Sequence, residues 1–288
     1  MIVRLFCPQC AYEATKNFKG HTVLEVPVPI SSLSDNGQYK VECEKGHVST
    51  VILDNIKFEL LFEMGLNAIV DGYTREAVSS FSSALECFYA FYWHVVMRHF
   101  DIPAEQANAT WKPLSKLSER QVGAYSTAVN LLTKCAPKLL NPNKQVPFRN
   151  NVIHNGYVPR KEEAISFGED VMELINPDLA ILRVQATDAM GSVYKDFSPR
   201  NYDEKPNDDE DDSIIVAYTN VLTAIDVMHP PEGDDLRVGG VSNQFQRIIK
   251  GRQPKAMHLL SEEEMKKNYP EMGESCASEL NRLTKGST

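Results

Sequence analysis

Residues 74–99 have the sequence TREAVSSFSSALECFYAFYWHVVMRH, which predicts one long helix. Its apolar residues recur three and four positions apart, so they fall on one helix face. Thr74 is placed to cap the start of this helix. A face this rich in Phe and Tyr is more typical of a bundle core than of a cofactor site. The residues of the face are Val78, Phe81, Ala84, Leu85, Phe88, Tyr92, Val95 and Val96.

Helical spacing continues on both sides of this segment. One helix is predicted between Ile56 and Val70, and another between Ser118 and Cys135. A short helix opens at Phe148, and a long one follows from about Lys161 to Met190, with Pro177 as a kink position. Consecutive helices with short connections predict a mainly α chain built on an antiparallel up-and-down bundle.

The first fifty-three residues have a different character, with short alternating segments broken by proline and by Asp35-Asn36-Gly37. They contain Cys7-Pro-Gln-Cys10 and Cys43-Glu-Lys-Gly-His47. Paired ligands on two tight turns are typical of a closed tetrahedral zinc site. A β-rich unit of this size has a small core, and a structural metal is the usual way to stabilise it. The pattern resembles a zinc ribbon with Cys7, Cys10, Cys43 and His47 as ligands of one structural zinc per chain.

The alternative is three unrelated buried thiols and a surface histidine. His21 is a spare ligand candidate that lacks a partner in the spacer. The other cysteines, Cys87, Cys135 and Cys276, are predicted to be packing or surface residues.

Residues 148–156, FRNNVIHNG, contain the side chains with the clearest chemistry. On a helix Asn150 and His154 share one face, and Arg149 flanks them. Imidazole can move a proton near neutral pH, and a guanidinium can hold a phosphate. These groups suit attack of an RNA 2′-hydroxyl on its neighbouring phosphate, a reaction that needs no metal.

The motif Arg149-Asn150-x-x-x-His154, in its place within an all-helical module, resembles the signature of the HEPN superfamily over about residues 54–190. The resemblance implies a metal-independent endoribonuclease that acts as a homodimer, in host defence or a toxin-like response. It implies that Arg149 contacts the scissile phosphate, that His154 is the general acid or base, and that Asn150 orients the histidine or the ribose. It also implies an acidic residue on an earlier helix, best matched by Glu86, which should meet Arg149 or reach solvent because burial of an unpaired carboxylate is costly.

A non-catalytic reading uses the same residues. Arg149 would only pair with Glu86, His154 would lie at the C-terminus of its helix, and the chain would be a dimerising module whose zinc ribbon binds a protein or nucleic acid. A zinc-dependent hydrolase is a weaker alternative, because a Cys3His set leaves no open coordination position.

Charge is distributed unevenly along the chain. The net formal charge is −9, yet residues 112–161 contain nine Lys and Arg residues and a single acid, Glu119. An RNA backbone fits this stretch, with Lys144, Arg160 and Lys161 as candidate contacts; a solvated helical face is the alternative.

Four segments are predicted: a zinc ribbon (1–53), a HEPN-like bundle (54–195), an acidic linker (196–212) and a C-terminal extension of unknown role (213–288). Within the extension, residues 213–228 are either a strand with a turn or one helix, residues 244–252 are helical, and Ser261 begins a final helix. The ribbon and the extension are candidate surfaces for a protein partner. No apolar run reaches the length of a membrane span, and Met1–Cys7 lacks a basic-then-apolar leader, so we expect a cytoplasmic protein without membrane contact.

Overall fold

The computed structural model describes residues 2–10, 25–29, 37–43, 45–199, 215–219, 223–233, 235 and 237–252. The chain divides into two compact units. One is helical and contains residues 54–203 and 220–252; the other is β-rich and includes residues 2–53 and 204–219. The predicted acidic run at 203–212, the helix start at Ser261, His21 and Cys276 lie outside the described residues.

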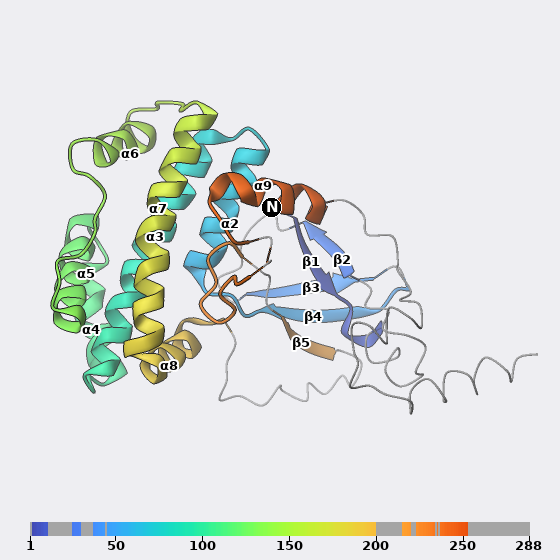
Figure 1. Cartoon of the computed structure of the whole chain (residues 1–288). Coiled ribbons are helices and arrows are strands. Elements are labelled where there is room, and N and C mark those ends of the chain that lie inside the picture. Colours follow the sequence, from blue (N-terminus) through green and yellow to red (C-terminus); the bar gives the residue numbers. More distant parts are fainter. Residues whose placement is uncertain are drawn as a thin grey trace, which may run out of the picture. The chain divides into compact units, whose positions relative to one another are not determined.

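The described chain is mainly helical, which confirms the predicted fold class at that level. Figure 1 shows the long helices α3 and α7 running side by side in the helical unit. The helices are α2 (Lys57–Val70), α3 (Thr74–His99), α4 (Ala104–Leu114), α5 (Ser118–Thr133), α6 (Gln145–His154), α7 (Lys161–Gln185), α8 (Thr187–Phe197) and α9 (Val241–Arg252).

The core is organised around α3, which has the predicted bounds. All eight residues of its predicted apolar face are buried. Aromatic rings join α3 to its neighbours: Phe88 meets Phe58 of α2 edge to face at 5.5 Å, and Tyr89 lies 4.4 Å from Tyr125 of α5. Burial of a large aromatic side chain stabilises the fold by about 1.5–3 kcal/mol, so this face dominates the stability of the helical unit.

Three details differ from the prediction. Thr74 does not cap α3; it is the first helical residue, and its hydroxyl donates to the Pro159 carbonyl at 2.7 Å. The long helix predicted after Lys161 is two helices, because the backbone leaves helical geometry at Ala186, while Pro177 lies inside α7. Helix α4 was not predicted, since Ala107 is its only buried residue and it has no apolar stripe.

The β-rich unit contains two sheets in its described part. Strands β1 (Ile2–Phe6) and β2 (Glu25–Pro29) form an antiparallel pair. In the second sheet β4 (Val48–Leu53) lies between antiparallel β3 (Gln38–Glu42) and parallel β5 (Ile215–Thr219), with Ser49 opposite Ile215. Of the two predictions for residues 213–228, the structure shows a strand at 215–219, and residues 223–228 form neither helix nor strand.

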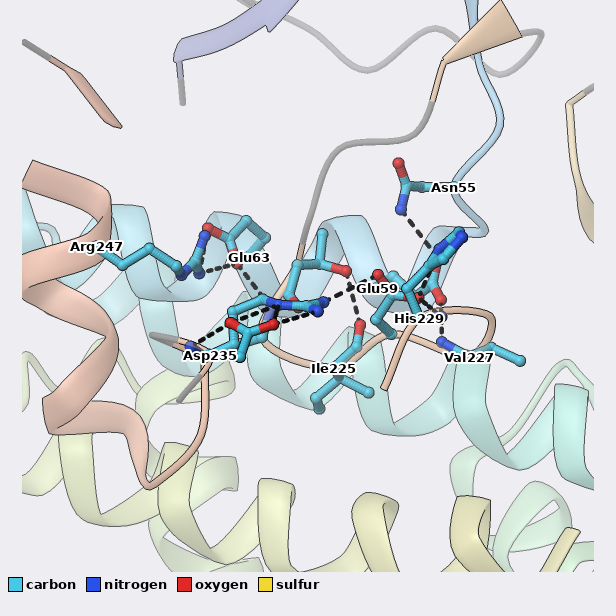
Figure 2. A network of polar contacts seen from close by, with 12 residues as sticks. Asn55, Glu59, Glu63, Ile225, Val227, His229, Asp235 and Arg247 are labelled. Carbon is cyan, nitrogen blue, oxygen red and sulfur yellow. Dashed lines mark hydrogen bonds and ion pairs between the residues drawn. The ribbon is translucent and has the colours of Figure 1, made fainter. Parts of the chain in front are cut away.

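The segment predicted as one C-terminal extension is divided between the units. Residues 215–219 complete the second sheet, whereas residues 223–252 belong to the helical unit. Two carboxylates on α2 hold this second part in place (Figure 2). Glu59 accepts from the Val227 N–H at 2.7 Å, and Glu63 accepts from the Ala224 N–H at 3.2 Å and from Arg247 Nη2 at 2.7 Å.

Further charged residues extend this polar network around residues 223–237. The Arg237 guanidinium contacts Asp235 at 2.7 Å and Asp226 at 3.2 Å, and Arg183 donates to the Asp226 carbonyl at 2.7 Å. Glu59 is fully buried, and burial together with the charge of Asp226 raises its pKa to about 8, against the effect of the N–H groups that it accepts. A buried acid with a raised pKa keeps its proton in the folded state at pH values where the unfolded chain has lost it.

We predict that Glu59 makes the helical unit less stable as pH rises from about 4.5 to about 8. In this window the Glu59 carboxyl is ionised in the unfolded chain and protonated in the folded one. The free energy of unfolding therefore falls by roughly 1.4 kcal/mol per pH unit. Urea unfolding of the wild type and Glu59→Gln can be followed by Trp fluorescence, because both tryptophans, Trp93 and Trp111, lie in this unit. The wild type should lose roughly 1–4 kcal/mol relative to the variant between pH 5 and pH 8.

Glu76→Gln is the matched control, because Glu76 is an exposed acid on α3. The difference in free energy of unfolding between Glu76→Gln and the wild type should be the same at both pH values. A pH-independent difference for Glu59→Gln as well would contradict the raised pKa.

Candidate functional site

The predicted zinc ligands come together in the β-rich unit. One ligand atom from each of Cys7, Cys10, Cys43 and His47 lies within 4.8 Å of all the others, and the three cysteines are buried. Cys10 Sγ is 3.8 Å from Cys43 Sγ, and Cys7 Sγ is 3.8 Å from His47 Nδ1. Ligands about 2.3 Å from a tetrahedral zinc are roughly 3.8 Å apart, so the donor set has the size of a metal site.

The backbone around these ligands forms two turns. The Cys10 N–H points at Cys7 Sγ at 3.5 Å, as expected for a two-residue spacing that brings an amide to a thiolate. In the second turn the Gly46 N–H donates to the Cys43 carbonyl at 2.8 Å, and Gly46 has φ of 78°, where a side chain would be strained. The sequence CEKGH thus folds so that Cys43 and His47 face the first pair.

The electrostatics of the thiols differ. Burial and the neighbouring thiols raise the pKa of Cys10 to about 12. For Cys43 the N–H groups of His47 and Lys45 outweigh burial and lower the pKa. Several adjacent thiolates cannot coexist without a compensating cation, which is the role that a metal ion has in such a cluster.

In the helical unit, Arg149 and Glu86 form an ion pair. Arg149 lies on α6, and its Nη2 bonds Glu86 Oε1 on α3. Ser118, the first residue of α5, donates to the same oxygen at 2.6 Å. The Arg149 side chain is 20% exposed and that of Glu86 is 31% exposed. Glu86 therefore pairs with Arg149 and is also partly exposed to solvent.

Further contacts fix α6 on the bundle. Arg75 of α3 donates to the Ile153 carbonyl at 3.5 Å, and the Phe148 ring packs on Phe167 of α7 with centroids 5.7 Å apart. Val152 is the buried residue of α6. These contacts position Arg149 from three helices.

Asn150 and His154 lie differently with respect to Arg149. Asn150 Oδ1 accepts from Arg149 Nη1 at 3.4 Å. His154 is the last residue of α6 and is exposed. It lies five positions after Arg149, so the two side chains leave the helix about 140° apart. The structure brings together Arg149, Asn150 and Glu86, and it leaves His154 at the accessible end of the same helix.

A cavity of about 380 Å³ lies beside the ion pair. Its polar wall includes Glu86, Ser118, Arg149 and Asn150, whereas most of its other lining is apolar. Leu139, Leu140 and Pro142, in the connection between α5 and α6, line part of it. Ser118, Tyr89 and this connection were not predicted as site residues, because only the packing of α3, α5 and α6 brings them together.

The predicted RNA contacts lie on the surface. Lys144, Arg160 and Lys161 are exposed. Arg160 pairs with Glu163 at 3.3 Å, and Lys161 Nζ lies 5.4 Å from the centre of the Phe245 ring. Acidic neighbours offset part of the positive charge that the sequence composition indicates.

No family model matches the chain, and neither a curated protein nor a solved structure matches it. Within the described residues no helix has both the length and the apolar content needed to cross a bilayer.

Proposed function

We propose that the chain is a metal-independent endoribonuclease of HEPN type, in which Arg149, Asn150 and His154 act on RNA. The observation that carries this proposal is the placement of Arg149, a guanidinium held by Glu86 and Ser118 at the wall of a cavity large enough for part of a nucleotide. By resemblance, the biological setting would be host defence or a toxin-like response.

Arg149 is suited to hold a phosphate. A guanidinium has five N–H donors, and the contacts with Glu86, Ser118 and Asn150 occupy only part of them. The same contacts restrict the side chain to one position, so little reorganisation is needed when negative charge develops on the phosphate oxygens.

In the proposed reaction a ribose 2′-hydroxyl attacks the adjacent phosphorus as a histidine accepts its proton. The 5′-oxygen of the next nucleotide leaves and takes up a proton, which gives a 2′,3′-cyclic phosphate and a 5′-hydroxyl. His154 is the imidazole for one of these transfers, because it is exposed on the helix that carries Arg149. A homodimer would supply a second copy of the motif for the other transfer, and Lys144, Arg160 and Lys161 would contact the RNA backbone.

A non-catalytic interaction module is the second candidate, and the ion pair itself favours it. Glu86 balances the charge of Arg149, and a structural role for that pair needs no substrate. In this case the bundle dimerises, and the β-rich unit or the C-terminal segment binds a protein or nucleic-acid partner.

We also propose that Cys7, Cys10, Cys43 and His47 bind one structural zinc. The mixed sulfur and nitrogen donors, their separations and the small size of the unit support zinc over a hard cation such as Mg²⁺. Four protein ligands leave no open position for a substrate, so this zinc would stabilise the β-rich unit and take no part in cleavage.

For the nuclease we predict that the wild type cleaves RNA in the presence of EDTA, and that Arg149→Ala and His154→Ala each lose about 10²-fold or more of the rate. Arg98→Ala is the matched control for arginine, because Arg98 also contacts an acid and a serine, Asp196 and Ser192. His99→Ala is the control for histidine, because His99 is likewise an exposed last residue of a helix.

Both controls should retain the wild-type rate. Equal rates in all five proteins would overturn the assignment. Intact RNA with every variant, accompanied by a lower melting temperature for Arg149→Ala alone, would support the interaction module instead.

For the zinc site we predict that the purified chain contains about one equivalent of zinc by elemental analysis, and that Cys10→Ser loses it. Cys135→Ser is the control, because Cys135 is an exposed thiol. A chelator strong enough to remove the metal should destabilise the β-rich unit while the fluorescence of Trp93 and Trp111 stays native. Zinc retention by Cys10→Ser would show that the cluster is not the binding site.

A further inference from the structure

The cavity beside Arg149 combines an apolar interior with a short polar wall. Its volume of about 380 Å³ lies near the lower end of the range for small-molecule sites, which is about 300–1,000 Å³. It can hold one compact group and not a folded segment. Its apolar lining includes Leu85, Val122, Leu139, Leu140, Pro142 and Val146.

In the polar wall, Glu86 and Asn150 each keep one polar atom without a partner among the described residues. Glu86 uses Oε1 for both Arg149 and Ser118, and no described donor reaches its Oε2. Asn150 uses Oδ1 for Arg149, and no described acceptor reaches its Nδ2. The cavity wall therefore offers an acceptor and a donor on two side chains that contact the guanidinium.

The chemistry of these atoms restricts the ligand. A hydrocarbon would fill the apolar interior but leave the donor and the acceptor unpaired, which costs about 1–3 kcal/mol for each group. A simple carboxylate would pair with Arg149, but it has no donor for the Glu86 oxygen. A nucleobase fits both parts, because its flat faces are apolar and its edge carries donors beside acceptors.

Tyr89 also lines the cavity and adds to its apolar wall; it is 4% exposed. We propose that the cavity binds a single nucleobase of the RNA, next to the nucleotide whose phosphate meets Arg149. The site would place the bond to be cleaved and bias cleavage toward particular bases. This inference rests on the proposed nuclease function.

The test measures binding of the four ribonucleoside 3′-monophosphates and of ribose 5-phosphate, which has a sugar and a phosphate but no base, to the full chain by calorimetry. At least one nucleotide should bind at least tenfold more tightly than ribose 5-phosphate. Val122→Phe, which fills the cavity from α5, should weaken that binding at least tenfold. Val184→Phe should leave it unchanged, because Val184 is 83% exposed on α7 and does not line the cavity.

Leu139→Trp is a second variant and should weaken nucleotide binding by the same factor. Position 139 accommodates a larger side chain because Leu139 is 42% exposed. Equal binding of the nucleotides and ribose 5-phosphate, no binding of any nucleotide at millimolar concentration, or unchanged binding in both filled variants with native melting would each overturn the inference.

Cleavage of RNA by the same proteins separates this inference from the nuclease proposal. Base-dependent binding without cleavage by the wild type would support the nucleobase site and contradict the nuclease proposal. Cleavage with the same base preference in the wild type and in Val122→Phe would support the nuclease proposal and contradict the nucleobase site.

Discussion

The ion pair between Glu86 and Arg149 is the contact on which the candidate site depends. Helix α6 is short, and Val152 is its buried residue, so apolar burial alone gives it little hold on the bundle. The guanidinium joins it to the central helix α3, and Ser118 connects the same carboxylate to α5. Three helices therefore meet at one carboxylate, and the adjoining cavity exists because they meet there.

This arrangement has two opposite consequences for function. The contacts with Glu86, Ser118 and Asn150 fix the guanidinium in space, which favours catalysis by a preorganised charge. The carboxylate also reduces the positive charge available to a phosphate. Under the proposed function, a substrate that brings both a phosphate and a hydrogen-bonding base would use the guanidinium and the neighbouring atoms of Glu86 and Asn150 together.

Local patterns in the sequence predicted much of the helical unit and the composition of both sites. The spacing of apolar residues in 74–99 is set by the helix period, so the bounds and the buried face of α3 agree with the structure. The two-residue spacing of Cys7 and Cys10 and the three-residue spacing of Cys43 and His47 are also local, and these four residues come together. The HEPN resemblance singled out Glu86, and the cost of burying an unpaired charge predicted that it meets Arg149 or reaches solvent; the two residues form a pair, and Glu86 is 31% exposed.

Features that depend on distant parts of the chain were not predicted. Strand β5 is separated from its partner β4 by more than one hundred and fifty residues, and its own apolar run fitted a helix equally well. Likewise, no local pattern shows that Glu59 and Glu63 bind the backbone of residues 224–227. The cavity and its free atoms depend on how three helices pack, which composition and periodicity do not specify.

The most direct measurement of the central claim uses an RNA oligonucleotide with a single 2′-deoxy nucleotide on the 5′ side of the cleaved bond. If Arg149 and His154 promote attack by the 2′-hydroxyl, the unmodified strand will yield 2′,3′-cyclic phosphate and 5′-hydroxyl ends in chelator, and the modified bond will stay intact. Cleavage of the modified bond, or products with 5′-phosphate ends, would contradict the account.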